Sequence, residues 1–125
     1  MNSKVFMVLR ILLGIFVLVF GINKFAHFMP TPEGMSPDAL SYFSSLTVSK
    51  TMAVVGLVEI LAGLALLTNK FGALMSLILM SISFNAVLFH ATLDPGNIAG
   101  SLVLLVLNIA VLMGYKDSYK DLLAG

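Results

Sequence analysis

Four long apolar runs constrain this chain of 125 residues more than any other feature of its sequence. They occupy residues 5–28, 52–68, 71–93 and 98–115. Each run approaches or exceeds the roughly 20 residues that an α-helix needs to cross a hydrocarbon core about 30 Å thick. The runs therefore predict an all-α, polytopic membrane protein whose four transmembrane helices form an antiparallel bundle.

The composition supports a membrane environment and excludes several classes of function. Hydrophobic residues make up 59% of the chain and charged residues only 10%, whereas an ordinary soluble domain has roughly 25% charged residues. The alternative, a soluble bundle, would lack the polar surface that it needs. A net charge of +1 argues against nucleic-acid binding, which requires a basic face. Because the chain has no cysteine, disulfides, thiolate metal sites and thiol redox chemistry are excluded.

The length predicts a single domain, residues 1–125. Within this domain we expect helices at 4–28, 50–68, 71–93 and 97–115. The first run is interpreted as a spanning helix rather than a signal peptide, because no small-residue cleavage site follows it.

The only long connection, at 29–50, is predicted to be an outward-facing loop. Pro30 and Pro32 are expected to end the first helix, because proline lacks the amide hydrogen that a helix interior needs. Later in the loop, the pattern Ser36-Pro37-Asp38 predicts the start of a short helix at the membrane interface.

Lysine and arginine are distributed unequally between the two sides of the predicted bundle. The side opposite the termini carries two, Lys24 and Lys50. The side with both termini carries five, namely Lys4, Arg10, Lys70, Lys116 and Lys120. Since cytoplasmic segments are enriched in basic residues, both termini are predicted to be cytoplasmic.

Each predicted helix carries one stripe of small or polar residues at helical spacing. Such stripes face other helices rather than lipid, because glycines allow close packing and polar groups find partners there. The stripes contain Arg10, Gly14, Gly21 and Lys24; Gly56, Glu59 and Gly63; Ser76, Ser83, His90 and Asp94; and Asn97, Ser101 and Asn108. Asn85 falls on the opposite face from His90, so we expect it to contact a partner subunit.

Depth divides the polar residues into two layers. At about 1.5 Å per residue, Arg10 and Asn108 lie roughly 9 Å from the cytoplasmic end and Glu59 roughly 13 Å. We expect these three to form a buried polar cluster in which Arg10 pairs with Glu59. An unpaired charge at mid-membrane costs about 2.5 to 3.5 kcal/mol, so pairing is expected whether its role is structural or functional.

The second layer lies at the outer rim and supplies the candidate ligand-binding residues. They are Lys24, His27, His90, Asp94 and Asn97. Asp94 follows His90 by one helical turn, which can hold the imidazole in one tautomer. In the alternative interpretation, Lys24 snorkels and His27 anchors the helix at the interface. Two histidines without a third ligand argue against a haem or metal site, and no catalytic residue is predicted.

Several short motifs, in the same order along the chain, resemble those of DoxX-type membrane proteins. They lie at 10–14, 20–25, 55–63, 85–90 and 93–95, and read RILLG, FGINKF, VGLVEILAG, NAVLFH and LDP. The resemblance implies a four-helix protein of the bacterial inner membrane. It also implies that Arg10, Lys24, Glu59 and Asn108 are family-typical polar positions.

The resemblance further implies a role in a membrane redox complex. Some members of this family are subunits of a thiosulfate:quinone oxidoreductase, and others are linked to membrane complexes in thiol and oxidative stress. We therefore expect contact with the lipid bilayer, with a quinone or similar lipid-soluble redox partner, and with redox partner proteins. The alternative is a non-enzymatic membrane module that binds lipid or scaffolds other proteins. Four short helices without repeats argue against a transporter, and a homo-oligomer is compatible with the sequence.

Overall fold

The computed structural model describes residues 2–29 and 34–124, and its regular structure in these ranges is entirely helical. The described residues include four helices long and apolar enough to cross a membrane. They are α1 (Ser3–Ala26), α3 (Thr51–Thr68), α4 (Gly72–Leu93) and α5 (Ile98–Gly114), the last preceded by the 3₁₀ turn η1 (Pro95–Asn97). The predicted all-α membrane fold is confirmed.

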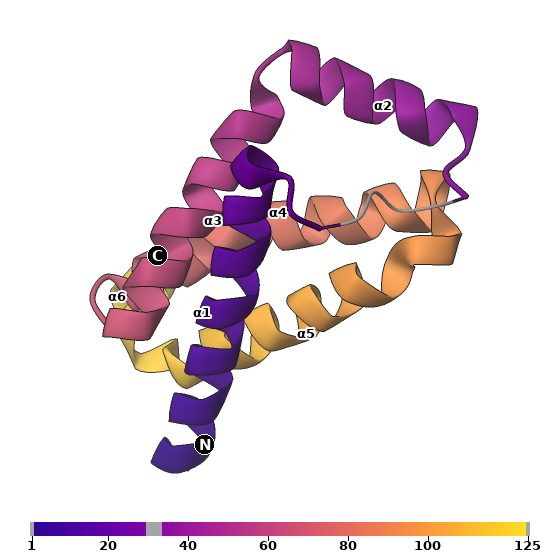
Figure 1. The fold of residues 1–125 in the computed structure, drawn as a ribbon. Helices are drawn as coiled ribbons and strands as arrows, with labels where there is room; N and C mark the ends of the chain where they lie inside the picture. The colour runs from indigo at the N-terminus through magenta and orange to yellow at the C-terminus, as the bar shows by residue number, and fades with distance from the viewer. Residues whose placement is uncertain (1, 30–33, 125) are drawn as a thin grey trace.

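The four spanning helices form a ring of antiparallel neighbours. α1 contacts α3 and α5, and α4 contacts the same two helices. A further helix, α2 (Pro37–Val48), lies across one end of the molecule, from the start of α3 toward the end of α4 (Figure 1). We call this end the α2 end. At the opposite end, the Phe6 ring near the N-terminus meets Tyr115, which follows α5, with ring centroids 4.9 Å apart.

Because glycine lacks a Cβ atom, the glycines of α1 and α3 let these helices approach more closely than any other residue would permit. A Cβ atom added at Gly21 would lie 2.9 Å from the Gly56 carbonyl oxygen, and one at Gly63 would lie 2.9 Å from the Gly14 carbonyl oxygen. Real Cβ atoms do not approach backbone oxygens so closely. The predicted packing of the small residues on these two helices is therefore confirmed.

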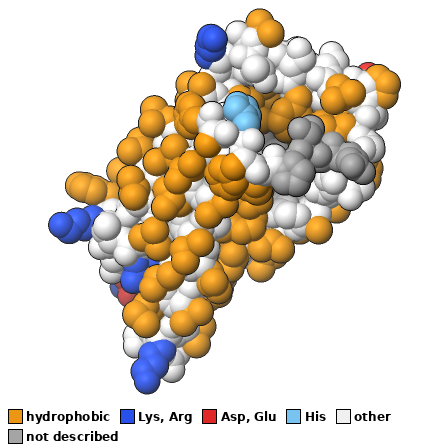
Figure 2. Space-filling view, in the orientation of Figure 1, with side chains coloured by type: hydrophobic (Ala, Val, Ile, Leu, Met, Phe, Trp, Pro, Cys, Tyr) orange, Lys and Arg blue, Asp and Glu red, His pale blue; other side chains and the backbone are white. Residues whose placement is uncertain are grey.

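All four spanning helices contribute to one buried apolar core, which consists of Leu13, Val17, Ala62, Leu66, Leu79, Leu104 and Val111. Outside this core, large apolar side chains remain exposed along every spanning helix. Figure 2 shows hydrophobic side chains covering most of the visible face, with Lys and Arg side chains at its extremities. Such a surface suits the lipid bilayer, where apolar side chains need no cover from water.

The connection after α1 differs in detail from the prediction. The helix ends at Ala26, because His27 adopts a left-handed conformation (φ 52°) and its N–H donates to the Asn23 carbonyl oxygen. Pro30 and Pro32, which were expected to end the helix, lie outside the described residues. The predicted short helix is confirmed: α2 begins at Pro37, and the Ser36 hydroxyl caps it by accepting a hydrogen bond from the Ala39 N–H (3.1 Å).

The segment after α5 folds back onto the start of α4. It comprises η2 (Lys116–Tyr119) and α6 (Lys120–Leu123). The Tyr119 hydroxyl donates to the Ala73 carbonyl oxygen (2.7 Å), and the Tyr115 hydroxyl donates to Asn69 Oδ1 (2.6 Å). Burial raises the pKa of the Tyr115 and Tyr119 phenols above the ordinary value for tyrosine. Both phenols are therefore protonated at neutral pH and can donate these hydrogen bonds.

Candidate functional site

A charged pair lies beside the close contact of α1 and α3 at Gly21 and Gly56. Lys24 Nζ is 2.5 Å from Glu59 Oε1, and the Glu59 side chain is only 4% exposed. In the described residues, Glu59 Oε1 accepts no hydrogen bond from any other group, so the ion pair with Lys24 is what compensates its charge. Since a charge buried in a membrane protein needs a partner of opposite sign, the pair accounts for both residues structurally.

The predicted pair between Arg10 and Glu59 is wrong. The Arg10 guanidinium instead donates to the carbonyl oxygen of Leu66 in the last turns of α3, a position that favours a cation. Helical side chains lean toward the N-terminus of their own helix. In the antiparallel pair, Lys24 and Glu59 therefore lean toward each other, whereas Arg10 leans away from the carboxylate.

Asn108 also has partners of its own, so the predicted three-residue cluster does not form. The fully buried Asn108 accepts a hydrogen bond from the Ser83 hydroxyl (2.7 Å) and donates one to the Ser76 carbonyl oxygen (3.0 Å). These bonds join α5 to α4 in the middle of the bundle. The burial of Ser76, Ser83 and Asn108 confirms that their stripes face inward.

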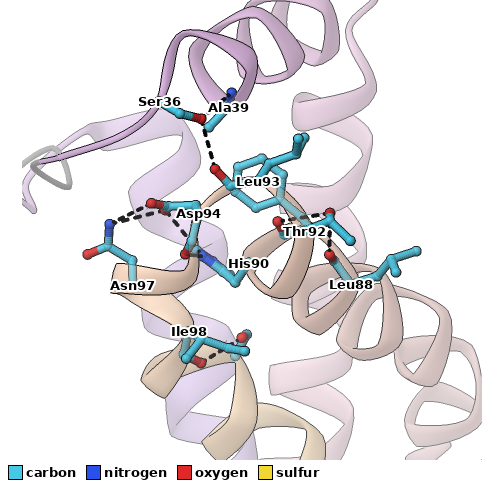
Figure 3. Close-up of polar contacts among 11 residues, drawn as sticks. Ser36, Ala39, Leu88, His90, Thr92, Leu93, Asp94, Asn97 and Ile98 are labelled. Atoms are coloured by element: carbon cyan, nitrogen blue, oxygen red, sulfur yellow. Dashed lines mark hydrogen bonds and ion pairs between the residues drawn. The ribbon is translucent and has the colours of Figure 1, made fainter.

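At the α2 end, three of the five predicted ligand-binding residues come together. His90 Nδ1 lies 3.3 Å from Asp94 Oδ2, and the Asn97 amide donates to both oxygens of the same carboxylate (3.0 and 3.1 Å). Figure 3 shows the three side chains converging from the last turn of α4 and from η1. We call these residues the His90 cluster.

The geometry of the His90 cluster leaves one ring nitrogen for a ligand. The Asp94 side chain is 2% exposed, so its carboxylate is fixed in place, and it engages Nδ1. The His90 side chain is 19% exposed, and Nε2 has no hydrogen-bond partner among the residues that the structure describes. An imidazole oriented in this way can accept or donate a proton at Nε2.

The other two predicted residues are not connected to His90. Lys24 is paired with Glu59, and His27 is an exposed residue that caps the end of α1. In the described ranges, no hydrogen bond or ion pair joins either of them to His90 or Asp94. The same ranges contain no group of three His, Asp or Glu side chains placed to hold a metal ion.

The packing of α2 on α4 adds a feature that the sequence interpretation missed. The Ser36 hydroxyl donates to the Leu93 carbonyl oxygen (2.9 Å; Figure 3), and the Tyr42 ring stacks on Phe89 with centroids 5.2 Å apart. Beneath this contact lies an open groove of about 110 Å³, lined by Tyr42, Asn85, Leu88, Phe89, Thr92 and Leu93. The aromatic residues of the interfacial helix were the signal available for this contact, but their partner on α4 depends on how α2 crosses the bundle.

Comparison with known proteins provides a family-level match. A family model described as DoxX matches residues 5–92, from the start of α1 to the last turn of α4. The match includes Lys24, Glu59 and His90, whereas Asp94 and Asn97 lie just beyond it. No curated protein and no solved structure matches the chain.

Proposed function

This chain belongs to the DoxX family, and we propose that it is a subunit of a membrane redox complex that contacts a quinone or a similar lipid-soluble redox partner. The observation that carries the proposal is the His90 cluster, in which a buried carboxylate holds one nitrogen of a partly exposed imidazole. Histidine is the side chain best suited to exchange protons near neutral pH. The reduction and oxidation of a quinone require such an exchange at its oxygens.

The residues around His90 fit a quinone head group. Such a group needs apolar contact for its ring and one polar partner for a carbonyl or hydroxyl oxygen. The buried Phe89 ring packs against the His90 ring with centroids 4.9 Å apart and makes the immediate surroundings of His90 apolar. The exposed apolar surface of the spanning helices would leave the tail of the molecule in lipid. The quinone, when bound, supplies the redox chemistry, whereas His90 holds a proton at Nε2 and Asp94 orients the ring.

Other parts of the proposal concern the setting of the protein. Because the chain has no cysteine, redox partner proteins would supply or receive the electrons. We place the protein in the bacterial inner membrane on the basis of its family. We also propose that both termini are cytoplasmic, an orientation supported by the five-to-two distribution of Lys and Arg between the two sides. We also propose that residues 1–125 form one domain, since Leu104 and Val111 of α5 share a core with Leu13 of α1.

Binding of a short-tailed quinone analogue to the protein in lipid nanodiscs tests the proposal. We expect His90→Gln to weaken binding by roughly 10- to 100-fold, the effect of losing a hydrogen bond that involves a charged or proton-exchanging group. The matched control is His27→Gln, which removes the other histidine from an exposed position at the same end. This control should bind the analogue as the unmodified protein does.

Two outcomes would contradict the proposal. If His90→Gln binds the analogue with unchanged affinity, the His90 cluster has no role in quinone contact. If both histidine variants lose binding equally, the effect is not specific to the cluster. Either result would favour the alternative, a non-enzymatic membrane module. Lys24→Met is unsuitable as a single probe, because it would leave Glu59 buried without its partner.

A further inference from the structure

One stripe of α4 faces away from the other three spanning helices and has the spacing of a helix–helix seam. Its six residues are separated by alternating steps of four and three, and all of them are exposed: Leu74, Ile78, Ser81, Asn85, Leu88 and Thr92. This alternation is the repeat by which two helices pack along their length. Figure 3 shows Leu88 and Thr92 on the opposite side of α4 from Asp94 and Asn97. We call this stripe the α4 seam.

Asn85 is the residue on the α4 seam whose polar groups are not satisfied. Its amide nitrogen donates to the Ser81 carbonyl oxygen (3.2 Å), but in the described part of the chain its Oδ1 accepts no hydrogen bond. The hydroxyls of Ser81 and Thr92, in contrast, donate to carbonyl oxygens of their own helix (2.9 and 2.7 Å). Asn85 therefore needs a partner from outside this chain.

The depth of Asn85 makes that need stronger. The residue lies eight positions before the end of α4 at Leu93, or about 12 Å along the helix axis. At that depth a lipid-facing amide meets hydrocarbon rather than water or head groups, and an unsatisfied amide is costly there. Asparagine at such positions promotes association of transmembrane helices.

We propose that α4 of one copy packs along the α4 seam of a second copy, with the two Asn85 amides hydrogen-bonded to each other across a twofold axis. A primary amide carries both a donor and an acceptor, so two copies satisfy each other without any further group. Copies inserted with the same topology present parallel α4 helices, and a twofold axis along the membrane normal then aligns Asn85 with Asn85. The groove beside Asn85, Leu88 and Thr92 lies at one end of the seam and gives space for side chains of the second copy.

Cysteine cross-linking tests this arrangement cleanly, because the chain has no cysteine of its own. Single cysteines are introduced at the seam positions Ile78, Ser81 and Leu88, which leave Asn85 in place, and membranes that contain the full chain are oxidised with copper phenanthroline. We expect covalent dimers from all three variants. The matched control for Leu88 is Val103→Cys, since each residue lies five positions from the end of its helix at the α2 end. Val103 is on the exposed face of α5 (48% exposed) and its variant should give few dimers.

A second measurement separates the role of the Asn85 amide from simple proximity. In the Ser81→Cys background, replacement of Asn85 by Leu should lower the association constant by about tenfold, the expected loss for two interhelical hydrogen bonds in a membrane. The fraction of cross-linked dimer should fall accordingly. Circular dichroism confirms that the variant keeps its helices. Equal cross-linking on α5 and on the α4 seam, no cross-linking at any seam position, or an unchanged dimer fraction in the Leu variant would each overturn the proposal.

Discussion

Arg10 and Lys24 lie on the same stripe of α1, yet they satisfy their charges in different ways. Arg10 donates to a backbone carbonyl oxygen near the end of α3, and Lys24 pairs with Glu59. The depth estimate from the sequence placed Arg10 close enough to Glu59 to pair with it. It did not include the direction in which helical side chains lean, and that direction separates Arg10 from Glu59 in an antiparallel pair.

A double-mutant cycle on Lys24 and Glu59 tests the charge pair. Lys24→Met should lower the free energy of unfolding by about 3 to 5 kcal/mol, because the Glu59 carboxylate is left buried without a partner. The double variant with Glu59→Gln should lose less than the sum of the two single losses. SDS-induced unfolding of the protein in bicelles measures each free energy.

A second double-mutant cycle serves as the control and combines Glu59 with Arg10 instead of Lys24. Arg10→Met and Glu59→Gln should have additive effects, within about 0.5 kcal/mol, because these residues share no partner. If the Arg10 cycle showed strong coupling and the Lys24 cycle were additive, Glu59 would be paired with Arg10, as the depth estimate predicted.

At the scale of whole elements, the sequence predicted more than it did for single side chains. Four apolar runs and the Ser36-Pro37-Asp38 pattern were sufficient to predict four spanning helices and α2. These features depend on local chemistry. The stacking of Tyr42 on Phe89, in contrast, depends on how α2 crosses the ring of helices, and no local pattern determines that crossing.

The glycine contacts between α1 and α3 support a prediction at this scale. Gly63→Ala should destabilise the protein by about 1 to 3 kcal/mol, because the added Cβ would lie 2.8 Å from Leu18 Cβ and force the helices apart. Gly100→Ala is the control, since a Cβ there meets no atom within 4 Å. The same SDS titration should find Gly100→Ala as stable as the unmodified protein or slightly more so, since alanine favours a helix. Equal losses in both variants would mean that the close approach does not matter.

At the scale of the whole molecule, the arrangement of the chain ends has a simple physical origin. With an even number of spanning helices, both termini lie on one side of the membrane, and the Phe6–Tyr115 contact brings their flanking segments together. The distribution of charges indicates which side of the membrane this is. The exposed Lys4, Lys70 and Lys116 all lie on the side of the termini, whereas Lys50 lies at the α2 end.

Topology reporters test this arrangement. A reporter that is active only in the cytoplasm, fused after Gly125, should be active, whereas the same reporter inserted at the exposed Gly34 should be inactive. A reporter that is active only outside the cytoplasm should give the reverse pattern at both sites. The physical reason is that basic residues are retained in the cytoplasm during insertion, and the majority of them flank the termini. Activity of the same reporter at both sites would mean that an even number of segments crosses the membrane between them, instead of the three helices α3, α4 and α5. A full reversal would mean that the α2 end faces the cytoplasm.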